Sequence, residues 1–453
     1  MRRFLCFLFI LFCIFALAFK NENDKDDDKA PLFEKPNGWE KPVYDFSQNP
    51  LHKDAVYLGR VLFYDPILSR DSTISCASCH SPYNAFTHVD HDLSHGIDGR
   101  IGTRNAPALM NLAWHKQFMW DGAIHHLDVQ AMAPISHPDE MDENMAHLVE
   151  KLERSEPYRR LFYHAFADST ITGERLLKAM AQFLVTLVSA DSKYDKVMRR
   201  ETVFSAQEKK GYQLFKRHCA TCHTEPLFTN LEFKNNGLAV DTFLWDKGRM
   251  TVTQRAADSL CFKVPTLRNI EFSYPYMHDG RFKKLSGVLQ HYTTGIQQSS
   301  TLADELRRGI PLSANDKADL MSFLLTLSDT AFLFDARFSA PKIPITTVPK
   351  QAATENNLPA STTISRQKER KIPHWKVIQD SLNELLVVQM TNLTQVAFTV
   401  QLLHTKRQFI EQKMLYPGST IVWFDTRTLY DGDYIVEINT GTALLRQEIV
   451  IKK

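Results

Sequence analysis

Up to about residue 335, apolar residues recur at intervals of three and four, a spacing that predicts amphipathic helices. Three such sets stand out: Leu51, Ala55, Leu58 and Leu62; Met145, Leu148, Val149 and Leu152; and Leu176, Leu177, Met180, Phe183, Leu184, Leu187 and Val188. Ser205 with Glu208, and Ser313 with Asp316, have the spacing of capping boxes, so we expect a helix to begin at each serine. The pattern therefore predicts a mainly α-helical body.

After residue 335 the pattern changes. Residues 336–372 are rich in Pro, Thr, Ser and Ala, and we expect them to form a linker. Beyond the linker, apolar and polar residues alternate, which predicts short strands. The expected strands contain residues 385–387, 398–400, 421–423, 434–438 and 449–451. Residues 373–453 are thus predicted to form a small antiparallel β-sandwich domain, either an accessory module or a sorting domain.

The first residues have the pattern of a targeting segment. Arg2 and Arg3 precede an apolar run over residues 4–19 that ends near Ala16 and Ala18. We expect residues 1–19 to be a signal peptide or an N-terminal anchor, and acidic residues 20–39 to be a tether. The expected location is the periplasm of a Gram-negative bacterium, with a membrane-anchored or cell-surface form as the alternative.

Composition narrows the class of protein. The chain has 453 residues, 43% of them hydrophobic, which is enough for more than one globular core. Its formal net charge of +2 argues against nucleic acid as a partner. Four of the seven cysteines lie in two short motifs, and Cys6 and Cys13 lie in the targeting segment. Cys261 is left alone, and we expect it to be a buried small apolar residue.

The two motifs carry the chemistry. Each has the form Cys-x-x-Cys-His, and their members are Cys76, Cys79 and His80 in the first and Cys219, Cys222 and His223 in the second. The pattern is the attachment site of a c-type haem, because two thiols add to the haem vinyl groups and the histidine binds the iron. A single copy could be half of a zinc site. Two copies, each set between predicted helices, predict two covalent haems in two cytochrome c-like domains, residues 40–190 and 191–335.

Residues 40–335 resemble the bacterial dihaem cytochrome c peroxidase family, including its MauG-type branch. The stretches that carry the resemblance are residues 102–107, 118–122, 264–269 and 274–280, which read GTRNAP, FMWDG, VPTLRN and YPYMHDG. They lie in the family's order relative to both motifs. The resemblance implies a peroxidase whose first haem binds hydrogen peroxide and whose second haem receives electrons. It also implies a small cytochrome c as donor, and a homodimer is a further expectation.

The resemblance implies roles for residues between the motifs. Glu140 matches the family's distal glutamate, which moves the peroxide protons, and Gln130 matches its pocket glutamine. Trp120 matches the tryptophan between the two haems. Pro134 matches a proline of the pocket wall. Without the family, Glu140 would be interpreted as a solvated acid at the start of a helix and Trp120 as a core residue.

The sixth ligand of each iron is less certain from sequence. At the second haem, Tyr292 lies where the MauG-type branch has an axial tyrosine, and Met277 and His291 are rival ligands. A phenolate there would lower the haem potential relative to a thioether. At the first haem, His95 is the nearest candidate for a resting ligand among three loop histidines. The alternative is a loop of solvated histidines that leaves the iron open.

The family also holds a calcium ion. In this chain the matching positions are Asn105, through its side-chain oxygen, and Ser273 and Pro275, through their carbonyl oxygens. The end of the chain, residues 430–453, weakly resembles sorting domains of type IX secretion cargo. The expected function is peroxide reduction with electrons from a small redox donor. A MauG-like oxidase of a protein or organic substrate, and an electron carrier without peroxide chemistry, are the alternatives.

Overall fold

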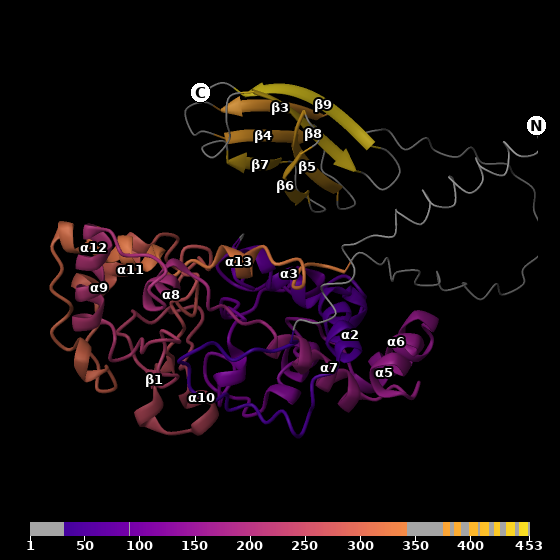
Figure 1. Ribbon diagram of the computed structural model, residues 1–453, viewed down its shortest axis with the longest axis horizontal. Helices are drawn as coiled ribbons and strands as arrows, with labels where there is room; N and C mark the ends of the chain where they lie inside the picture. Colours follow the sequence, from indigo (N-terminus) through magenta and orange to yellow (C-terminus); the bar gives the residue numbers. More distant parts are fainter. Residues whose placement is uncertain are drawn as a thin grey trace, which may run out of the picture. The chain divides into compact units, whose positions relative to one another are not determined.

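The structure is a computed structural model that describes residues 31–89, 91–341 and seven strands between 375 and 451 (Figure 1). The chain divides into two compact units, Met1–Gln351 and Ala352–Lys453. The predicted targeting segment and most of the predicted linker lie outside the described residues. Within the described residues, no helix has both the length and the apolar character needed to cross a membrane. The first unit is mainly helical, as predicted.

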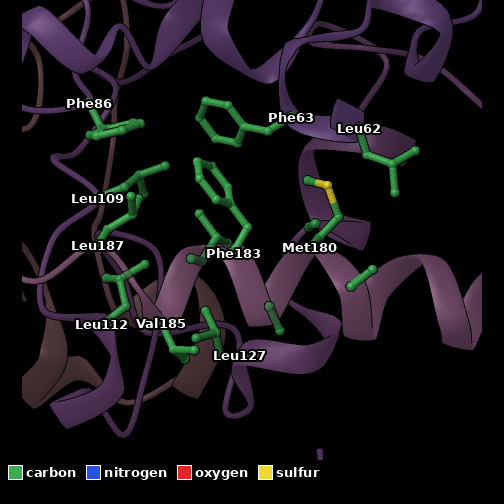
Figure 2. Packing of buried hydrophobic residues seen from close by; sticks show 14 of the residues in the cluster. Leu62, Phe63, Phe86, Leu109, Leu112, Leu127, Met180, Phe183, Val185 and Leu187 are labelled. Carbon is green, nitrogen blue, oxygen red and sulfur yellow. The ribbon is translucent and has the colours of Figure 1, made fainter. Parts of the chain in front are cut away.

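The first half of the helical unit is built around a crossing of two helices. They are α2 (Lys53–Tyr64) and α7 (Gly173–Val185), with α5 (Met145–Glu153) and α6 (Glu156–Phe166) packed beside them. Gly59 makes the crossing close, because a Cβ there would lie 1.9 Å from the carbonyl oxygen of Ala179. The rings of Phe63 and Phe183 meet edge to face at 5.4 Å, and Figure 2 shows them pointing toward one another. The apolar sets predicted for this half are the buried faces of these helices.

The second half repeats this crossing with other residues. Its helices are α9 (Ala206–His218) and α12 (Ala314–Leu325), which begin after the capping boxes predicted at Ser205 and Ser313. A Cβ on Gly211 would lie 1.9 Å from the carbonyl oxygen of Asp319, and it would also meet Phe323 four residues later. In the first half, Gly59 likewise meets Ala179 and then Phe183, four residues later. In both halves, therefore, a Cys-x-x-Cys-His motif follows a helix whose glycine packs closely against the last long helix of that half.

The remaining α-helices and strands that are described in this unit are short. They are α3 (Cys76–Cys79), α4 (Met132–Ser136), α8 (Lys193–Met198), β1 (Phe233–Lys234), α10 (Met250–Thr253), β2 (Phe262–Lys263), α11 (Leu285–Gln290) and α13 (Thr330–Leu333). The two-residue strands β1 and β2 pair antiparallel, with Phe233 opposite Lys263. A π-helical turn, His291–Gly295, follows α11.

The end of the helical unit returns to the first half. Phe332 and Leu333 on α13, and Phe338 beyond it, are buried in the same hydrophobic cluster as α2 and α7. The Arg60 guanidinium donates to the carbonyl oxygen of Ser339 at 2.6 Å, and the Tyr64 hydroxyl donates to that of Phe338 at 2.5 Å. The first residues of the expected linker, from 336 to 339, therefore contact α2. The sequence did not predict this packing, because Phe338 is a single apolar residue and has no periodic neighbours.

The second unit consists of antiparallel strands. Its described elements are β3 (Trp375–Asp380), β4 (Leu385–Met390), β5 (Phe398–His404), β6 (Gln408–Leu415), β7 (Ile421–Asp425), β8 (Gly432–Asn439) and β9 (Leu444–Ile451). One sheet has the order β3-β4-β7 and the other β6-β5-β8-β9. Buried residues from both sheets form one hydrophobic cluster. The five strands predicted from alternation are confirmed, and β3 and β6 are additional.

Candidate functional site

The first Cys-x-x-Cys-His motif forms a single helical turn. Ser75 and Ser78 close a capping box around α3, and the His80 N–H donates to the carbonyl oxygen of Cys76 at 2.9 Å. His80 Nδ1 lies 2.7 Å from the carbonyl oxygen of Phe86, which is fully buried. That bond leaves Nε2 free to face an iron. Burial lowers the pKa of His80 to about 4, which favours the neutral imidazole that ligates metal.

The second motif repeats this geometry at the end of α9. The His223 N–H donates to the carbonyl oxygen of Cys219 at 2.9 Å. His223 Nδ1 lies 3.1 Å from the carbonyl oxygen of Phe228 and 3.2 Å from that of Pro265. Burial again lowers the pKa of the histidine to about 4. Phe86 and Phe228 both have positive φ, 57° and 55°, which turns each carbonyl back toward its histidine. Sequence reasoning missed both phenylalanines.

One large cavity joins the two motifs. Its volume is about 650 Å³, and all four motif cysteines and both histidines line it. The lining also contains most of the other residues expected at the site, although not the rival ligand His291: Asn105, Trp120, Gln130, Pro134, Glu140, Ser273, Pro275, Met277 and Tyr292. Four thiols and two histidines with oriented Nδ1 atoms fit two covalently attached haems. The structure therefore brings the predicted site residues together in one space.

Glu140 enters this cavity from the turn after α4. Its backbone N–H donates to the carbonyl oxygen of His137 at 3.0 Å, and its own carbonyl accepts from Ile97 at 2.8 Å. Gly96 permits this close approach, because a Cβ there would lie 2.4 Å from the Glu140 carbonyl oxygen. Burial raises the pKa of the Glu140 carboxyl. A carboxyl group whose pKa is raised in this way holds a proton more readily than a solvated one, as proton transfer to and from a substrate requires.

Gln130 and Trp120 are fixed by different contacts. Gln130 lines the cavity, and its Nε2 lies 3.6 Å from the sulfur of Met119. Trp120 Nε1 donates to the carbonyl oxygen of Asn105 at 2.8 Å, and the Trp120 carbonyl accepts from Lys263 at 2.7 Å. The indole is therefore held at both its ring and its backbone.

An ion-pair network lies beside Trp120. Arg104 donates to Asp121 at 2.6 Å and to both oxygens of Asp246 at 2.6 and 2.9 Å. Burial alone would raise the pKa of Asp246, but the hydrogen bonds and charge of Arg104 hold that pKa below its usual value. A bidentate contact of this kind fixes both partners in orientation. It ties residues 104 and 121 of the first half to residue 246 of the second.

The expected calcium ligands are gathered in part. The Asn105 amide lies 2.5 Å from the carbonyl oxygen of Pro275, and the Asn105 N–H donates to His278 at 2.7 Å. Asn105 is buried, and Ser273 lines the same cavity. In the part of the chain that is described, no group of three or more His, Cys, Asp or Glu could hold a metal ion. In this contact the Asn105 amide nitrogen donates to the Pro275 carbonyl oxygen; the side-chain oxygen of Asn105 and the carbonyl oxygens of Ser273 and Pro275 are of the kind that suits calcium rather than a transition metal.

The three rival ligands of the second site all contact Asn236. Asn236 Nδ2 donates to the sulfur of Met277 at 3.4 Å, and His291 Nε2 lies 3.0 Å from the Asn236 carbonyl oxygen. The Asn236 side chain is also hydrogen-bonded to Tyr292, which lines the cavity. Burial raises the pKa of Tyr292 to about 12. Asn236 therefore contacts all three candidate ligands, and no motif in the sequence pointed to it.

The loop histidines of the first site form a stack. The rings of His88 and His91 are 5.2 Å apart, and those of His91 and His95 are 4.2 Å apart and nearly parallel. His95 lines the cavity, and its carbonyl oxygen lies 3.6 Å from the sulfur of Cys79. Burial lowers the pKa of His95. The structure thus places His95 beside the first motif.

Comparisons with known proteins identify relatives of this chain. The family model described as di-haem cytochrome c peroxidase matches residues 53–203. The methylamine utilization protein MauG of Methylorubrum extorquens is 35% identical over 306 residues, which cover 65% of this chain and 83% of that protein. The cytochrome c peroxidase Ccp of Escherichia coli is 35% identical over 64% of this chain and 61% of its own length. A solved MauG-like protein associated with microbial copper homeostasis superposes with a TM-score of 0.63, at 30% identity, over 69% of this chain and 99% of its own.

Proposed function

The chain belongs to the di-haem cytochrome c peroxidase family, and from that premise we propose that it reduces hydrogen peroxide to water with electrons from a small cytochrome c. The family implies two c-type haems and an oxidoreductase that acts on peroxide. The observation that carries the finer proposal is the single cavity that holds both motifs together with the buried carboxyl of Glu140. An electron carrier without peroxide chemistry would have no use for that carboxyl.

The residues that would hold the haems are the two motifs. Cys76 and Cys79 would bind the first haem and Cys219 and Cys222 the second, with His80 and His223 as iron ligands. The haems supply the redox chemistry. The polypeptide supplies orientation, through the Phe86 and Phe228 carbonyls that fix both imidazoles.

Proton transfer is assigned to Glu140. Its carboxylate takes a proton from the peroxide oxygen on the side of the first motif and returns it to the other oxygen, which leaves as water. Gln130 orients the peroxide through its amide. Trp120, fixed by the Asn105 carbonyl, provides the aromatic ring through which electrons pass between the two motifs. Asn105, Ser273 and Pro275 are proposed to bind one calcium ion that joins the two halves.

A second candidate is a MauG-like oxidase that uses peroxide equivalents on an organic or protein substrate. The observation that favours it is the place of Tyr292, which lines the cavity close enough to Cys219 and Cys222 for both thiols to affect its pKa, whereas His291 does not line the cavity. A phenolate ligand stabilises ferric and more oxidised iron. Such a site is better suited to storing an oxidising equivalent than to receiving an electron from a weak donor.

Peroxide turnover distinguishes the two candidates. The haem-loaded, full-length protein is mixed with hydrogen peroxide and a reduced small cytochrome c, and cytochrome oxidation is followed by its absorbance. The proposed function expects steady turnover in which two cytochromes are oxidised for each peroxide. Peroxide consumption without cytochrome oxidation would contradict it and favour the oxidase. Both haems reduced and reoxidised with no peroxide consumption would favour the carrier.

A further inference from the structure

A loop of the second half exposes a cluster of apolar side chains. Phe243 is 94% exposed, Trp245 is 64% exposed, and Val240 beside them is 43% exposed. Single exposed apolar residues are common on protein surfaces, but several large ones within six residues of one loop are typical of a place where another molecule binds. Trp245 is also readily oxidised, unlike the phenylalanine and valine. The loop therefore combines a binding surface with a redox-capable ring.

The loop is held by its own hydrogen bonds. The carboxylate of Asp241 accepts from the N–H groups of Phe243 at 2.8 Å and Leu244 at 3.1 Å, and its carbonyl accepts from that of Trp245 at 2.9 Å. Trp245 has a φ of 46°, which residues other than glycine seldom adopt. Unusual backbone held by surrounding bonds is often found at functional positions. These hydrogen bonds therefore hold the turn in a conformation in which the Trp245 indole is exposed to solvent.

A chain of bonded side chains connects this turn to Trp120. Asp246 follows Trp245 directly, and its carboxylate is bound by Arg104, which also binds Asp121, the residue after Trp120. The side chains of Asp246, Arg104 and Asp121 are only 7%, 21% and 12% exposed. Charge-assisted hydrogen bonds that are shielded from water are short and strong. The indole in the cavity and the indole at the surface are therefore linked by covalent bonds and close hydrogen bonds.

We infer that Trp245 is a surface redox residue that takes electrons from phenolic groups on molecules too large to enter the haem cavity. The inference rests on the proposed peroxidase function, which supplies the oxidising equivalent. In each step the Trp245 indole gives one electron toward Trp120 and its N–H proton to solvent. It then regains one electron and one proton from a phenol, which leaves as a phenoxyl radical. Two phenols are oxidised for each hydrogen peroxide that becomes two waters.

Substitutions at the loop separate the redox role from the shape of the surface. Trp245→Phe removes the oxidisable ring and keeps an apolar side chain, and Trp245→Tyr keeps an oxidisable ring. Phe243→Leu is the matched control, because it alters the same exposed cluster without removing the indole. Each haem-loaded, full-length variant is given peroxide and one of two donors. The donors are tyramine coupled to dextran, which cannot enter the cavity, and ascorbate, which is small.

We expect Trp245→Phe to lose oxidation of the dextran-bound phenol while ascorbate-dependent peroxide consumption stays at the wild-type rate. Trp245→Tyr should retain a measurable part of the polymer oxidation, and Phe243→Leu should retain most of it. Full polymer oxidation by Trp245→Phe would overturn the inference and leave the peroxidase proposal intact. Equal loss with both donors would also overturn it. A wild-type protein that consumes no peroxide with either donor would instead refute the proposed function.

A second readout does not depend on turnover. Trypsin releases residues 235–247 as a peptide in which Trp245 is the only Trp, Tyr, Met or Cys. After peroxide is added without a donor, mass spectrometry should find oxygen added to this peptide in the haem-loaded wild type. Tyr163, which is 57% exposed on α6, reports oxidation by diffusing species. Equal modification at Tyr163 and Trp245 would show that the loop has no privileged link to the cavity.

Discussion

At the scale of single residues, the two motif histidines are oriented by the same kind of hydrogen bond. Each Nδ1 is bonded to the backbone carbonyl of a phenylalanine with positive φ, which fixes the ring and directs Nε2 into the cavity. The spacing of cysteines and histidines was enough to predict the attachment sites. It could not reveal Phe86 or Phe228, because their function lies in a carbonyl group that every residue has. Asn236 was missed for a similar reason, since its partners come from distant parts of the chain.

Glu140 gives the sharpest prediction at this scale. Glu140→Gln should leave both haems attached and lower peroxide turnover by about 10²-fold or more, the usual loss when a positioned acid–base group is removed. Steady-state kinetics with a reduced cytochrome measure it. Asp139→Asn, one residue away, is the matched control and should stay near the wild-type rate. Full activity in Glu140→Gln would exclude Glu140 as the proton carrier.

The same residue sets the pH dependence. Glu140 must be deprotonated to accept the peroxide proton, so activity should rise with pH through its pKa. Because burial raises that pKa, the acidic limb of kcat/KM should lie above about 4.3, the ordinary value for glutamic acid. The limb should be absent from the residual activity of Glu140→Gln. A limb that persists unchanged in this variant would belong to another group.

Tyr292 allows a test by potential rather than by rate. Tyr292→Met should raise the reduction potential of the second haem, because a thioether stabilises ferrous iron and a phenolate stabilises ferric iron. A spectroscopic redox titration measures both haems at once, and the first haem serves as the internal reference. If neither potential moves, Tyr292 does not bind the iron. Asn236→Leu is a useful companion, since it should release Met277 to compete for the site.

At the scale of elements, the long amphipathic helices were predictable and the short ones were not. The spacing of leucines predicted α2, α5 and α7, and the capping boxes predicted the starts of α9 and α12. In α13 and in the paired strands β1 and β2, two to four residues are too few for a period to be visible. These short elements are stabilised by contacts with distant parts of the chain rather than by their own sequence pattern. The crossing geometry was also hidden, since a glycine in a helix shows only a low helix propensity until its neighbour is known.

The two glycine crossings give a matched prediction at this scale. Gly59→Ala and Gly211→Ala should each lower the free energy of unfolding by about 1–3 kcal/mol or more, because the added Cβ overlaps a backbone carbonyl that cannot move aside. Urea denaturation of the haem-loaded protein measures the change. Gly287→Ala in α11 is the control, since its Cβ would meet only the Phe282 side chain at 3.3 Å. Three equal effects would show that close approach is not the reason for the glycines.

At the scale of the whole molecule, the boundary between the units can be tested by truncation. A chain that ends at Pro341 keeps every described contact of the helical unit, so we expect it to retain both haems and full peroxide turnover. A chain that ends at Asp335 lacks Phe338 and the Ser339 carbonyl, and it should lose about 3–5 kcal/mol of stability, the usual range for removing a buried phenylalanine. Haem content and thermal unfolding of the two chains measure this. Loss of haem from the longer chain would place the strand unit within the catalytic core.

The packing of α13 and Phe338 against the first half also determines the order in which the two halves can complete their folding. A chain is synthesised from its amino end, and domains commonly fold as they emerge. Here the first half lacks Phe332, Leu333 and Phe338 until nearly all of the helical unit has appeared. Both cysteine motifs have therefore been synthesised before the core around the first one can close. The half that is made first is the half that is finished last, which keeps the first motif open to the machinery that attaches its haem.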